Sequence, residues 1–405
     1  MKAAMSGARG PAFRATQKTA KPNMHLESVV WGGECPLLVA WRCHTIPAIL
    51  LILSLLVVGC SGIDRSPPEP ANLTDQSTVL GIPNARFYAD TQAAAMAQEA
   101  LRAVERERAA VRPGAAGLEG RLPSADLLAI SGGSDDGAFG AGLLVGWTDA
   151  GTRPEFKLVS GVSTGALIAP FAFLGSAYDS QLRAIYTGVQ PADIYEKRLI
   201  LTAVFHESFA DTAPLFALIS RHFNEEMMAA IAREYGKGRL LLIGTTNLDS
   251  QRPVIWNIGA IAASGRPGAI ELVRKILLAS ASVPGLFPPV LKAVGRERHA
   301  FLIRNSRLDP DWASVERSLF SITGRAISTM IHYSGYNDVL RIYATTQRDG
   351  VDYNLAFIGP DFNAEHKEPF DQPYMRALFD YGYQRGRAGY SWRKAPPLLD
   401  TTTKP

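Results

Sequence analysis

Apolar and polar residues follow one another along this chain in short runs that predict strands and helices in alternation. Each apolar run of strand length is bounded by glycine or polar residues, and two of these runs lead directly into a helix-like segment. Strands that alternate with helices favour an α/β fold with a mostly parallel sheet that helices cover on both faces. The predicted strands are "DLLAIS" (126–131), "FKLVS" (156–160), "RLLLIGTTN" (239–247) and "PVIWNIG" (253–259), and the predicted helices are "LLVGWTDAG" (143–151) and "TGALIAPFAFLG" (164–175).

A different pattern precedes these elements. The segment "IPAILLILSLLVV" (46–58) is almost entirely apolar, but it is too short to cross a bilayer core of about 30 Å as a helix. It therefore predicts a signal peptide over residues 1–59. The following "VVGC" (57–60) resembles a bacterial lipobox, which implies that Cys60 carries a covalent lipid anchor. The alternative is a short buried helix that ends in a structural cysteine.

Two segments join this leader to the predicted core. Residues 60–88 begin with polar, proline-rich sequence, which predicts an extended tether. Residues 89–113 are rich in alanine and charge and stop at Pro113, so they predict a surface helix within a helical arm over 89–124.

Charge and cysteine content limit the possible partners. The chain has 42 Lys and Arg and 38 Asp and Glu, and removal of the leader leaves equal numbers of both. A chain without net positive charge is not expected to bind nucleic acid through phosphate contacts. Cys35 and Cys43 lie in the leader, so Cys60 has no disulfide partner. The sequence contains no CxxC pair, HExxH or Walker-type loop, so neither a metal nor a cofactor is expected.

The candidate nucleophile is Ser163. It stands in "GVSTG" (161–165), a G-x-S-x-G pattern placed between a predicted strand and a predicted helix. In that context a sharp turn presents the serine Oγ above the sheet, and the small residues Gly161 and Gly165 make room for the strained backbone. The alternative is an ordinary turn in which Ser163 caps the helix that follows.

A glycine-rich loop, "SGGSDDGAFGAG" (131–142), follows the first predicted strand. Small residues leave backbone N–H groups unobstructed, and the helix that follows adds the positive end of its dipole. Gly132, Gly133 and Ser134 are therefore the candidate oxyanion-hole donors. The loop could also hold a phosphate group, although it matches neither common phosphate-binding pattern.

Together these residues resemble the patatin-like phospholipases, acyl hydrolases that use a Ser–Asp dyad on a three-layer α/β/α fold. The resemblance rests on the glycine loop, on G-x-S-x-G and on "ASASVPGLFPPV" (279–290), and it covers residues 125–390, leaving 391–405 as a tail. It implies that Ser163 is the nucleophile. The chain departs from the family loop G-G-G-x-[RK]-G, because Ser134 and Asp136 occupy the third glycine and the basic position.

The aspartate of the dyad is missing from its expected place. In the family it lies in a D-G-[GA] motif a little downstream of P-G-x-F-P-P, yet here no Asp occurs between Pro289 and Asp309. The chain passes instead to "AFLIRN" (300–305), a late predicted strand, so we infer a deletion. Other aspartates have other expected roles: Asp349 lies in a turn, Asp309 and Asp311 start a helix, and Asp135 and Asp136 would repel an oxyanion.

Histidine is the other possible base, and a Ser-Asp-His triad would make the protein an α/β-hydrolase. None of the histidines after the leader lies in a motif, and a triad is recognised by its geometry. The general base is therefore unknown from the sequence. These histidines are His206, His222, His299, His332 and His366.

The expected function is that of a lipid-anchored serine acyl hydrolase in the bacterial cell envelope, facing the periplasm. The resemblance implies lipid or phospholipid esters as substrates and a membrane attachment through Cys60. The missing aspartate predicts impaired catalysis. The alternative is a non-catalytic envelope lipoprotein that binds lipid or a protein partner.

Overall fold

The computed structural model describes residues 69–70, 72–110, 122–194, 196–197, 210–281, 296–310 and 314–399. All of them belong to Arg65–Pro405, the second of two units into which the chain divides. The predicted leader and Cys60 lie outside the described residues, as do His206, Asp311 and most of the "ASASVPGLFPPV" segment.

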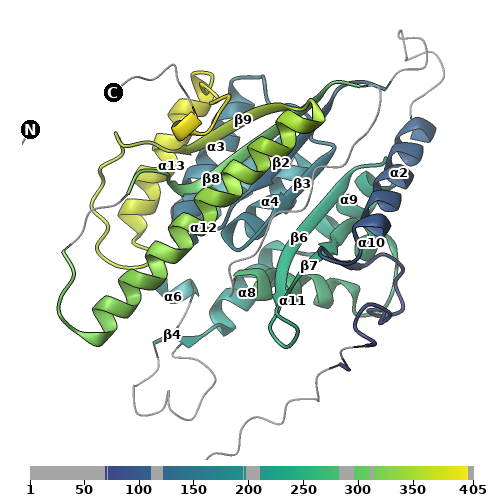
Figure 1. Cartoon of the computed structure of the whole chain (residues 1–405), viewed down its shortest axis with the longest axis horizontal. Coiled ribbons are helices and arrows are strands. Elements are labelled where there is room, and N and C mark those ends of the chain that lie inside the picture. The colour runs from purple at the N-terminus through teal and green to yellow at the C-terminus, as the bar shows by residue number, and fades with distance from the viewer. Residues whose placement is uncertain are drawn as a thin grey trace, which may run out of the picture. The chain divides into compact units, whose positions relative to one another are not determined.

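A sheet of seven strands forms the centre of the described fold (Figure 1), in the order β1-β7-β6-β3-β2-β8-β9. The pairs β6–β3, β3–β2, β2–β8 and β8–β9 are parallel, whereas β7 pairs antiparallel with both β1 and β6. A separate pair joins β4 and β5. The strands are β1 Arg86–Tyr88, β2 Ala125–Ile130, β3 Leu158–Gly161, β4 Glu196–Lys197, β5 Ala210–Asp211, β6 Leu240–Asn247, β7 Arg252–Asn257, β8 Arg298–Arg307 and β9 Asp352–Ile358.

Helices cover both faces of this sheet. Alternate strand residues point to opposite faces, and Leu128, Ile130 and Ile303 pack in one cluster with side chains of α3, α4 and α13. On the other face, Leu242 packs with Met96 of α2 and Leu302 with Val339 of α12. The helices are α2 Ala93–Ala110, α3 Gly137–Asp149, α4 Thr164–Leu174, α5 Asp179–Gly188, α6 Pro191–Ile194, α8 Ala213–His222, α9 Glu225–Gly236, α10 Ile258–Ala263, α11 Ala269–Ala281, α12 Leu319–Asp349 and α13 Gln372–Arg387.

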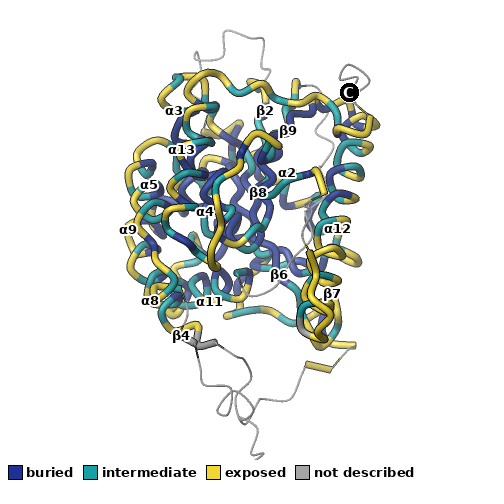
Figure 2. Tube along the Cα trace, turned by 90° about the vertical axis from the view of Figure 1, so that its left-hand side faces the viewer, coloured by how far each residue is buried: buried dark blue, intermediate teal, exposed yellow. Residues whose placement is uncertain are grey.

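The predicted α/β class, with three α/β/α layers and a mostly parallel sheet, is therefore confirmed. Buried residues gather in the strands and in α4, the helix that follows β3 (Figure 2). The predicted strands coincide with β2, β3, β6 and β7 to within about two residues.

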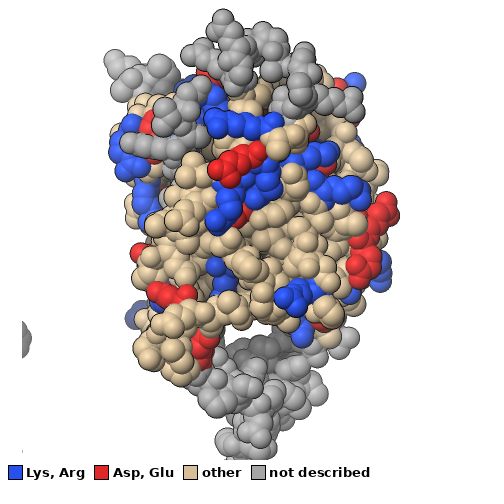
Figure 3. All heavy atoms as spheres, turned by 90° about the vertical axis from the view of Figure 1, so that its right-hand side faces the viewer, with Lys and Arg blue, Asp and Glu red and all other residues tan. Residues whose placement is uncertain are grey.

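The segment predicted as a surface helix packs more closely than expected. α2 buries Met96 and Ala103, and it also buries two carboxylates. Glu99 accepts a hydrogen bond from the Tyr235 hydroxyl at 2.7 Å, while Glu107 lies 2.7 Å from Arg296 Nη1. Basic side chains gather around acidic ones on the side of the molecule that carries this helix (Figure 3). These paired charges let a polar helix form part of the core layer.

Both ends of the described chain also join the domain. Phe87 and Tyr88 of β1 are buried, so the last residues of the segment expected as a tether belong to the sheet. Near the C-terminus, the Arg393 backbone pairs with Leu355 of β9, and the Trp392 ring lies 4.9 Å from Trp147. The first residues of the expected tail therefore pack on the domain.

α3 begins inside the glycine-rich segment, earlier than the sequence predicts. The glycines of α3 and α13 face each other: a Cβ added to Gly142 would overlap the Phe379 carbonyl oxygen, and one added to Gly382 would overlap that of Phe139. The glycines after Gly137 therefore permit close packing of two helices rather than a longer loop.

A capping serine and a glycine set the two ends of α12. Ser318, and neither Asp309 nor Asp311, caps this helix, because its hydroxyl accepts the Ser321 N–H at 3.2 Å. No described helix begins at Asp309, so the prediction for Asp309 is wrong, whereas Asp311 lies outside the described residues. At the other end, Gly350 adopts a left-handed conformation that ends α12 just before β9.

Candidate active site

Ser163 lies in the sharp turn between β3 and α4. Its backbone has φ 54° and ψ −127°, a conformation that residues with a side chain rarely adopt. Two close approaches make this turn possible. A Cβ added to Gly161 would overlap the Gly165 carbonyl oxygen, and one added to Gly165 would overlap that of Ile130. Both glycines of G-x-S-x-G are thus required by packing, and the turn projects from the carboxyl edge of the parallel strands.

The Ser163 side chain does not cap the helix. Although Ser163 occupies the N-cap position of α4, its hydroxyl makes no capping hydrogen bond. Its backbone N–H donates to Ser280 Oγ at 3.0 Å, and the buried Ser280 hydroxyl donates to the Gly244 carbonyl at 2.7 Å. α11 thereby connects the turn to the middle of β6. Ser280 belongs to residues 279–281, the part of the third sequence block that the structure describes.

The glycine loop lies directly beside Ser163. A Cβ added to Gly132 would stand 3.6 Å from Ser163 Oγ. Gly133 has φ 157° and lies against Asn305 so closely that a Cβ would overlap the Asn305 carbonyl oxygen, and Ser134 has φ 53°. Among the described residues, none accepts a hydrogen bond from the N–H of Gly132 or Gly133. The loop therefore brings uncommitted backbone donors next to the hydroxyl.

Asn305 holds this loop in place and was not singled out in the sequence. Its fully buried side chain donates from Nδ2 to the Ser131 carbonyl at 2.9 Å and accepts the Gly140 N–H at 3.0 Å. The Asn305 N–H also donates to Ser131 Oγ at 2.8 Å. The only local signal was a polar residue at the end of the apolar run "AFLIRN".

The sequence match agrees with this geometry. The model of the family described as Patatin-like phospholipase matches residues 128–295, which include the glycine loop, the serine turn and the "FPPV" block. This segment is a patatin-like phospholipase domain. No curated protein matches the chain.

Several solved structures resemble the chain that carries this patatin-like domain. The type III effector protein ExoU is 14% identical, with 65% of this chain and 54% of that chain covered at a TM-score of 0.30. VipD from Legionella pneumophila is 11% identical. The match covers 66% of this chain and 68% of VipD, at a TM-score of 0.32. A structure of full-length ExoU of Pseudomonas aeruginosa in complex with SpcU is 12% identical. The match covers 66% of this chain and 52% of that chain, at a TM-score of 0.27. The chain thus spans about half the length of ExoU.

The patatin-like domain departs from its family at Ser134 and Asp136, and the structure shows what the loop aspartates do. Asp135 Oδ2 accepts hydrogen bonds from His366 Nε2 at 2.7 Å and from the Phe370 N–H at 2.8 Å. Asp136 Oδ1 accepts the Tyr374 hydroxyl at 2.6 Å, and burial raises the pKa of Asp136 to about 6. The two carboxylates fasten the segment before α13, and α13 itself, to the glycine loop.

Two residues that could be considered as bases, Asp349 and His299, lie at the opposite edge of the sheet from Ser163. Asp349 precedes β9, and its carboxylate pairs with Arg348 at 2.9 Å. His299 stands at the start of β8, where its Nδ1 lies 2.9 Å from Asp126 at the start of β2. Ser163 follows the end of β3, and these strands are parallel. Both groups therefore lie at the amino edge, opposite the serine.

The remaining candidates that the structure describes do not supply a base to the Ser163 hydroxyl either. Asp309 is exposed, His332 lies on α12, and His366 binds Asp135. No carboxylate or imidazole within the described ranges forms a hydrogen bond with Ser163 Oγ. The same ranges contain no group of His, Cys, Asp and Glu that could hold a metal ion, and none of their helices is long and apolar enough to cross a membrane.

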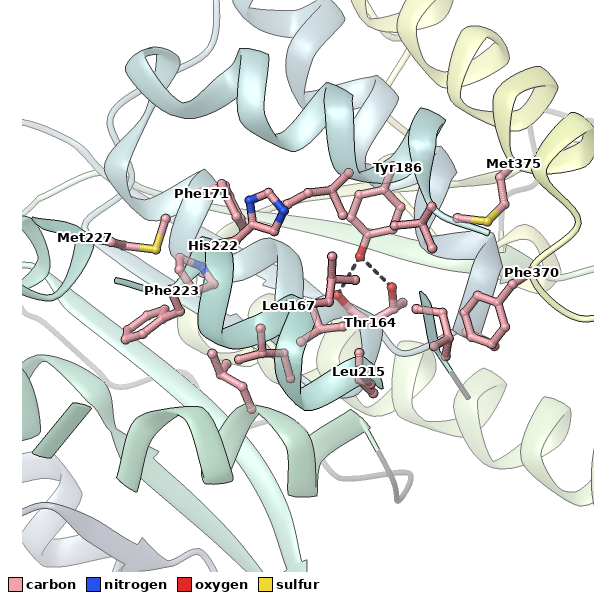
Figure 4. Close-up of a pocket in the computed structure, with 18 residues that line it drawn as sticks. Thr164, Leu167, Phe171, Tyr186, Leu215, His222, Phe223, Met227, Phe370 and Met375 are labelled. Carbon is pink, nitrogen blue, oxygen red and sulfur yellow. Dashed lines mark hydrogen bonds between the residues drawn. The ribbon is translucent and has the colours of Figure 1, made fainter. Parts of the chain in front are cut away.

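An apolar cavity of about 70 Å³ opens beside the serine turn (Figure 4). Thr164 and Ser134 border it, and the Tyr186 hydroxyl lies 2.7 Å from Thr164 Oγ1. Burial lowers the pKa of His222 at the far end, where Gln181 Nε2 lies 2.9 Å from its Nδ1. Most of the other lining side chains are apolar, and they include Leu167, Phe171, Leu215, Ile219, Met227 and Phe370.

Proposed function

We propose that this protein is a patatin-like serine acyl hydrolase that acts slowly on lipid or phospholipid acyl esters. The observation that carries the proposal is the strained turn at Ser163, which stands within contact distance of the glycine loop at the carboxyl edge of the sheet. A family match over residues 128–295 supports the same chemistry.

In this proposal Ser163 Oγ attacks the ester carbonyl carbon and gives its proton to water. The ester C–O bond then breaks, and the alcohol leaves after taking up a proton. Water hydrolyses the acyl-serine, which releases the fatty acid and restores Ser163. The backbone N–H groups of Gly132, Gly133 and Ser134 stabilise the negative charge that develops on the carbonyl oxygen. The acyl chain enters the adjoining cavity. Because that cavity has only about 70 Å³, far below the several hundred Å³ of a typical ligand pocket, short acyl chains are the substrates that it accepts without rearrangement.

Slow turnover follows from the sequence. The D-G-[GA] motif is absent from its expected place between Pro289 and Asp309, and the described residues provide no base in hydrogen-bond contact with Ser163 Oγ. A serine hydroxyl without a base stays protonated at neutral pH and is a weak nucleophile. This same feature favours the second candidate function, a non-catalytic envelope lipoprotein that binds lipid or a protein partner in the remaining pocket.

A fluorophosphonate probe separates the two. Weak labelling of the purified protein is expected, and Ser163→Ala should abolish it, while Ser176→Ala, which alters a serine outside the site, should leave it unchanged. Ester turnover that depends on Ser163 would support the hydrolase. Labelling that persists in Ser163→Ala would refute the nucleophile, and no turnover at all would favour the binding protein.

A further inference from the structure

The first half of α12 exposes a broad apolar face. Leu319, Ile322, Ile327, Met330, Ile331 and Tyr333 are between 52% and 77% exposed, whereas the buried side chains of this helix come from its second half. At 100° per residue, these six positions fall within about half of the helix circumference, which they share with Thr323, Ala326 and Ser334. Ser321, Arg325, Ser328 and His332 occupy the other half. We call the six side chains the α12 apolar face.

This face extends past the carboxyl edge of the sheet, on the side of Ser163. At about 1.5 Å per residue, residues 335–349 span ~22 Å, which matches the ~23 Å length of the antiparallel neighbour β9. Gly335 marks the boundary, because a Cβ there would overlap the Arg304 side chain of β8. The residues before Gly335 therefore reach beyond the strands, as Figure 1 shows at the lower left.

Another exposed apolar residue, outside α12, lies at the carboxyl edge of the sheet. β6 is parallel to β3 and ends at Asn247, so the β6–β7 turn leaves the carboxyl edge as Ser163 does. Leu248 in this turn is 70% exposed.

The half of α12 that extends beyond the sheet carries basic side chains but no acidic ones. Within residues 319–334 the ionisable side chains are Arg325, His332 and Tyr333, so this part has no acidic residue, while Glu316 and Arg317 both precede the helix. Its composition is also poor for a helix in water, because Ile, Ser, Thr and Gly dominate it. An isolated helix of this length is marginal without a surface to pack on. Basic charge next to an apolar face is typical of helices that lie at the surface of an anionic membrane.

We propose that the α12 apolar face docks on an anionic lipid surface and so presents the carboxyl edge, with Ser163, to the lipid. The proposal deepens the function proposed above, since a lipid acyl hydrolase has to reach its substrate at an interface. Its test does not depend on turnover.

The test uses the full chain with Ser163→Ala, to prevent hydrolysis, and with Cys60→Ala, to remove the expected acyl anchor. Binding is measured by co-sedimentation with vesicles of phosphatidylcholine, with or without phosphatidylglycerol. We expect binding to the anionic vesicles. Ile322→Ser with Met330→Ser should weaken it roughly tenfold or more, because two apolar side chains no longer enter the lipid. Leu101→Ser, at an exposed leucine of α2, is the matched control and should bind like the parent.

Hydrogen exchange gives a second measurement. Peptides from residues 319–334 should exchange more slowly when anionic vesicles are present, and the doubly substituted protein should lose this protection. Equal binding of parent and substituted protein would overturn the proposal. So would failure of the parent to bind, and a dimer in solution that only the substitution disrupts would then assign the face to a second copy of the chain. Vesicle binding in this test, combined with no ester turnover by the protein that keeps Ser163, would refute the hydrolase but leave the docking surface intact.

Discussion

Ser163 illustrates which residues could be predicted from the sequence. G-x-S-x-G predicts the turn because its two glycines are required by contacts within a few residues and with the neighbouring strand. Asn305 could not be predicted in the same way, since its partner Ser131 is 174 positions distant and only the folded sheet brings them together. The role of the loop aspartates was also hidden, because their partners His366 and Tyr374 follow the last strand.

The buried carboxyl group of Asp136 predicts that the stability of the protein depends on pH. Burial raises its pKa from 3.8 to about 6 in the folded protein. The folded state therefore binds the proton more tightly than the unfolded state, and this contribution is complete below pH 4 and is lost as the pH rises through about 6. Asp136→Asn, which cannot ionise and still accepts the Tyr374 hydroxyl, should raise the free energy of unfolding by about 1–3 kcal/mol at pH 8.

The measurement is denaturant unfolding of both proteins at pH 4.5 and pH 8, with most of the difference expected to vanish at the lower pH. Asp149→Asn is the matched control, because Asp149 also accepts a tyrosine hydroxyl, that of Tyr383 at 2.7 Å, but is exposed. An Asp136→Asn protein that is less stable than the parent at pH 8 would show that the ionised carboxylate stabilises the loop.

Among helices and strands, the buried parallel strands were the most predictable. Their apolar runs are continuous because both faces of the sheet are covered, so β2, β3 and β6 lie where the pattern places them. α2 was harder to interpret, since Glu99 and Glu107 count as polar in any pattern and are nevertheless buried by paired charges. α3 was misjudged at its start, because glycines that permit contact with α13 look the same in sequence as glycines of a loop.

The absence of a D-G-[GA] segment after the FPPV block predicts how inserting one would change the rate of ester hydrolysis. General-base assistance contributes about 10²–10⁴-fold to a rate, and groups that act as a unit lose most of their effect when one is absent. Insertion of a relative's D-G-[GA] segment after Val294 should therefore raise hydrolysis of a short-chain ester by a factor in that range.

The matched control for this insertion carries Asn in place of the inserted Asp and should lose the gain. Equal activity of the chain with and without the insertion, abolished in both by Ser163→Ala, would show that a base already reaches the serine. The described carboxylates and imidazoles provide no such contact, so that base would come from outside the described residues or from a rearranged site.

The candidate nucleophile, the apolar cavity and the α12 apolar face all belong to the carboxyl edge of the sheet. This arrangement follows from topology, since parallel strands bring their carboxyl ends to one side and the turn at Gly350 sends β9 back alongside α12. The proposed anchor at Cys60 would add a second attachment. Membrane binding that uses one weak signal is reversible, whereas two signals together hold a protein stably at the surface.

Cys60→Ala tests how these two attachments combine in cells. We propose that the mature protein is held in the bacterial envelope by a lipid on Cys60, for which "VVGC" is the sequence signal. A covalent lipid contributes about 0.8 kcal/mol per buried CH₂, more in total than a few exposed side chains of one helix. Cys60→Ala should therefore move most of the protein from the membrane fraction to the soluble fraction, and adding Ile322→Ser with Met330→Ser should remove the remainder. If Cys60→Ala stays wholly in the membrane fraction and intact mass shows no lipid on the parent, the anchor is wrong and the α12 apolar face has to account for the attachment alone.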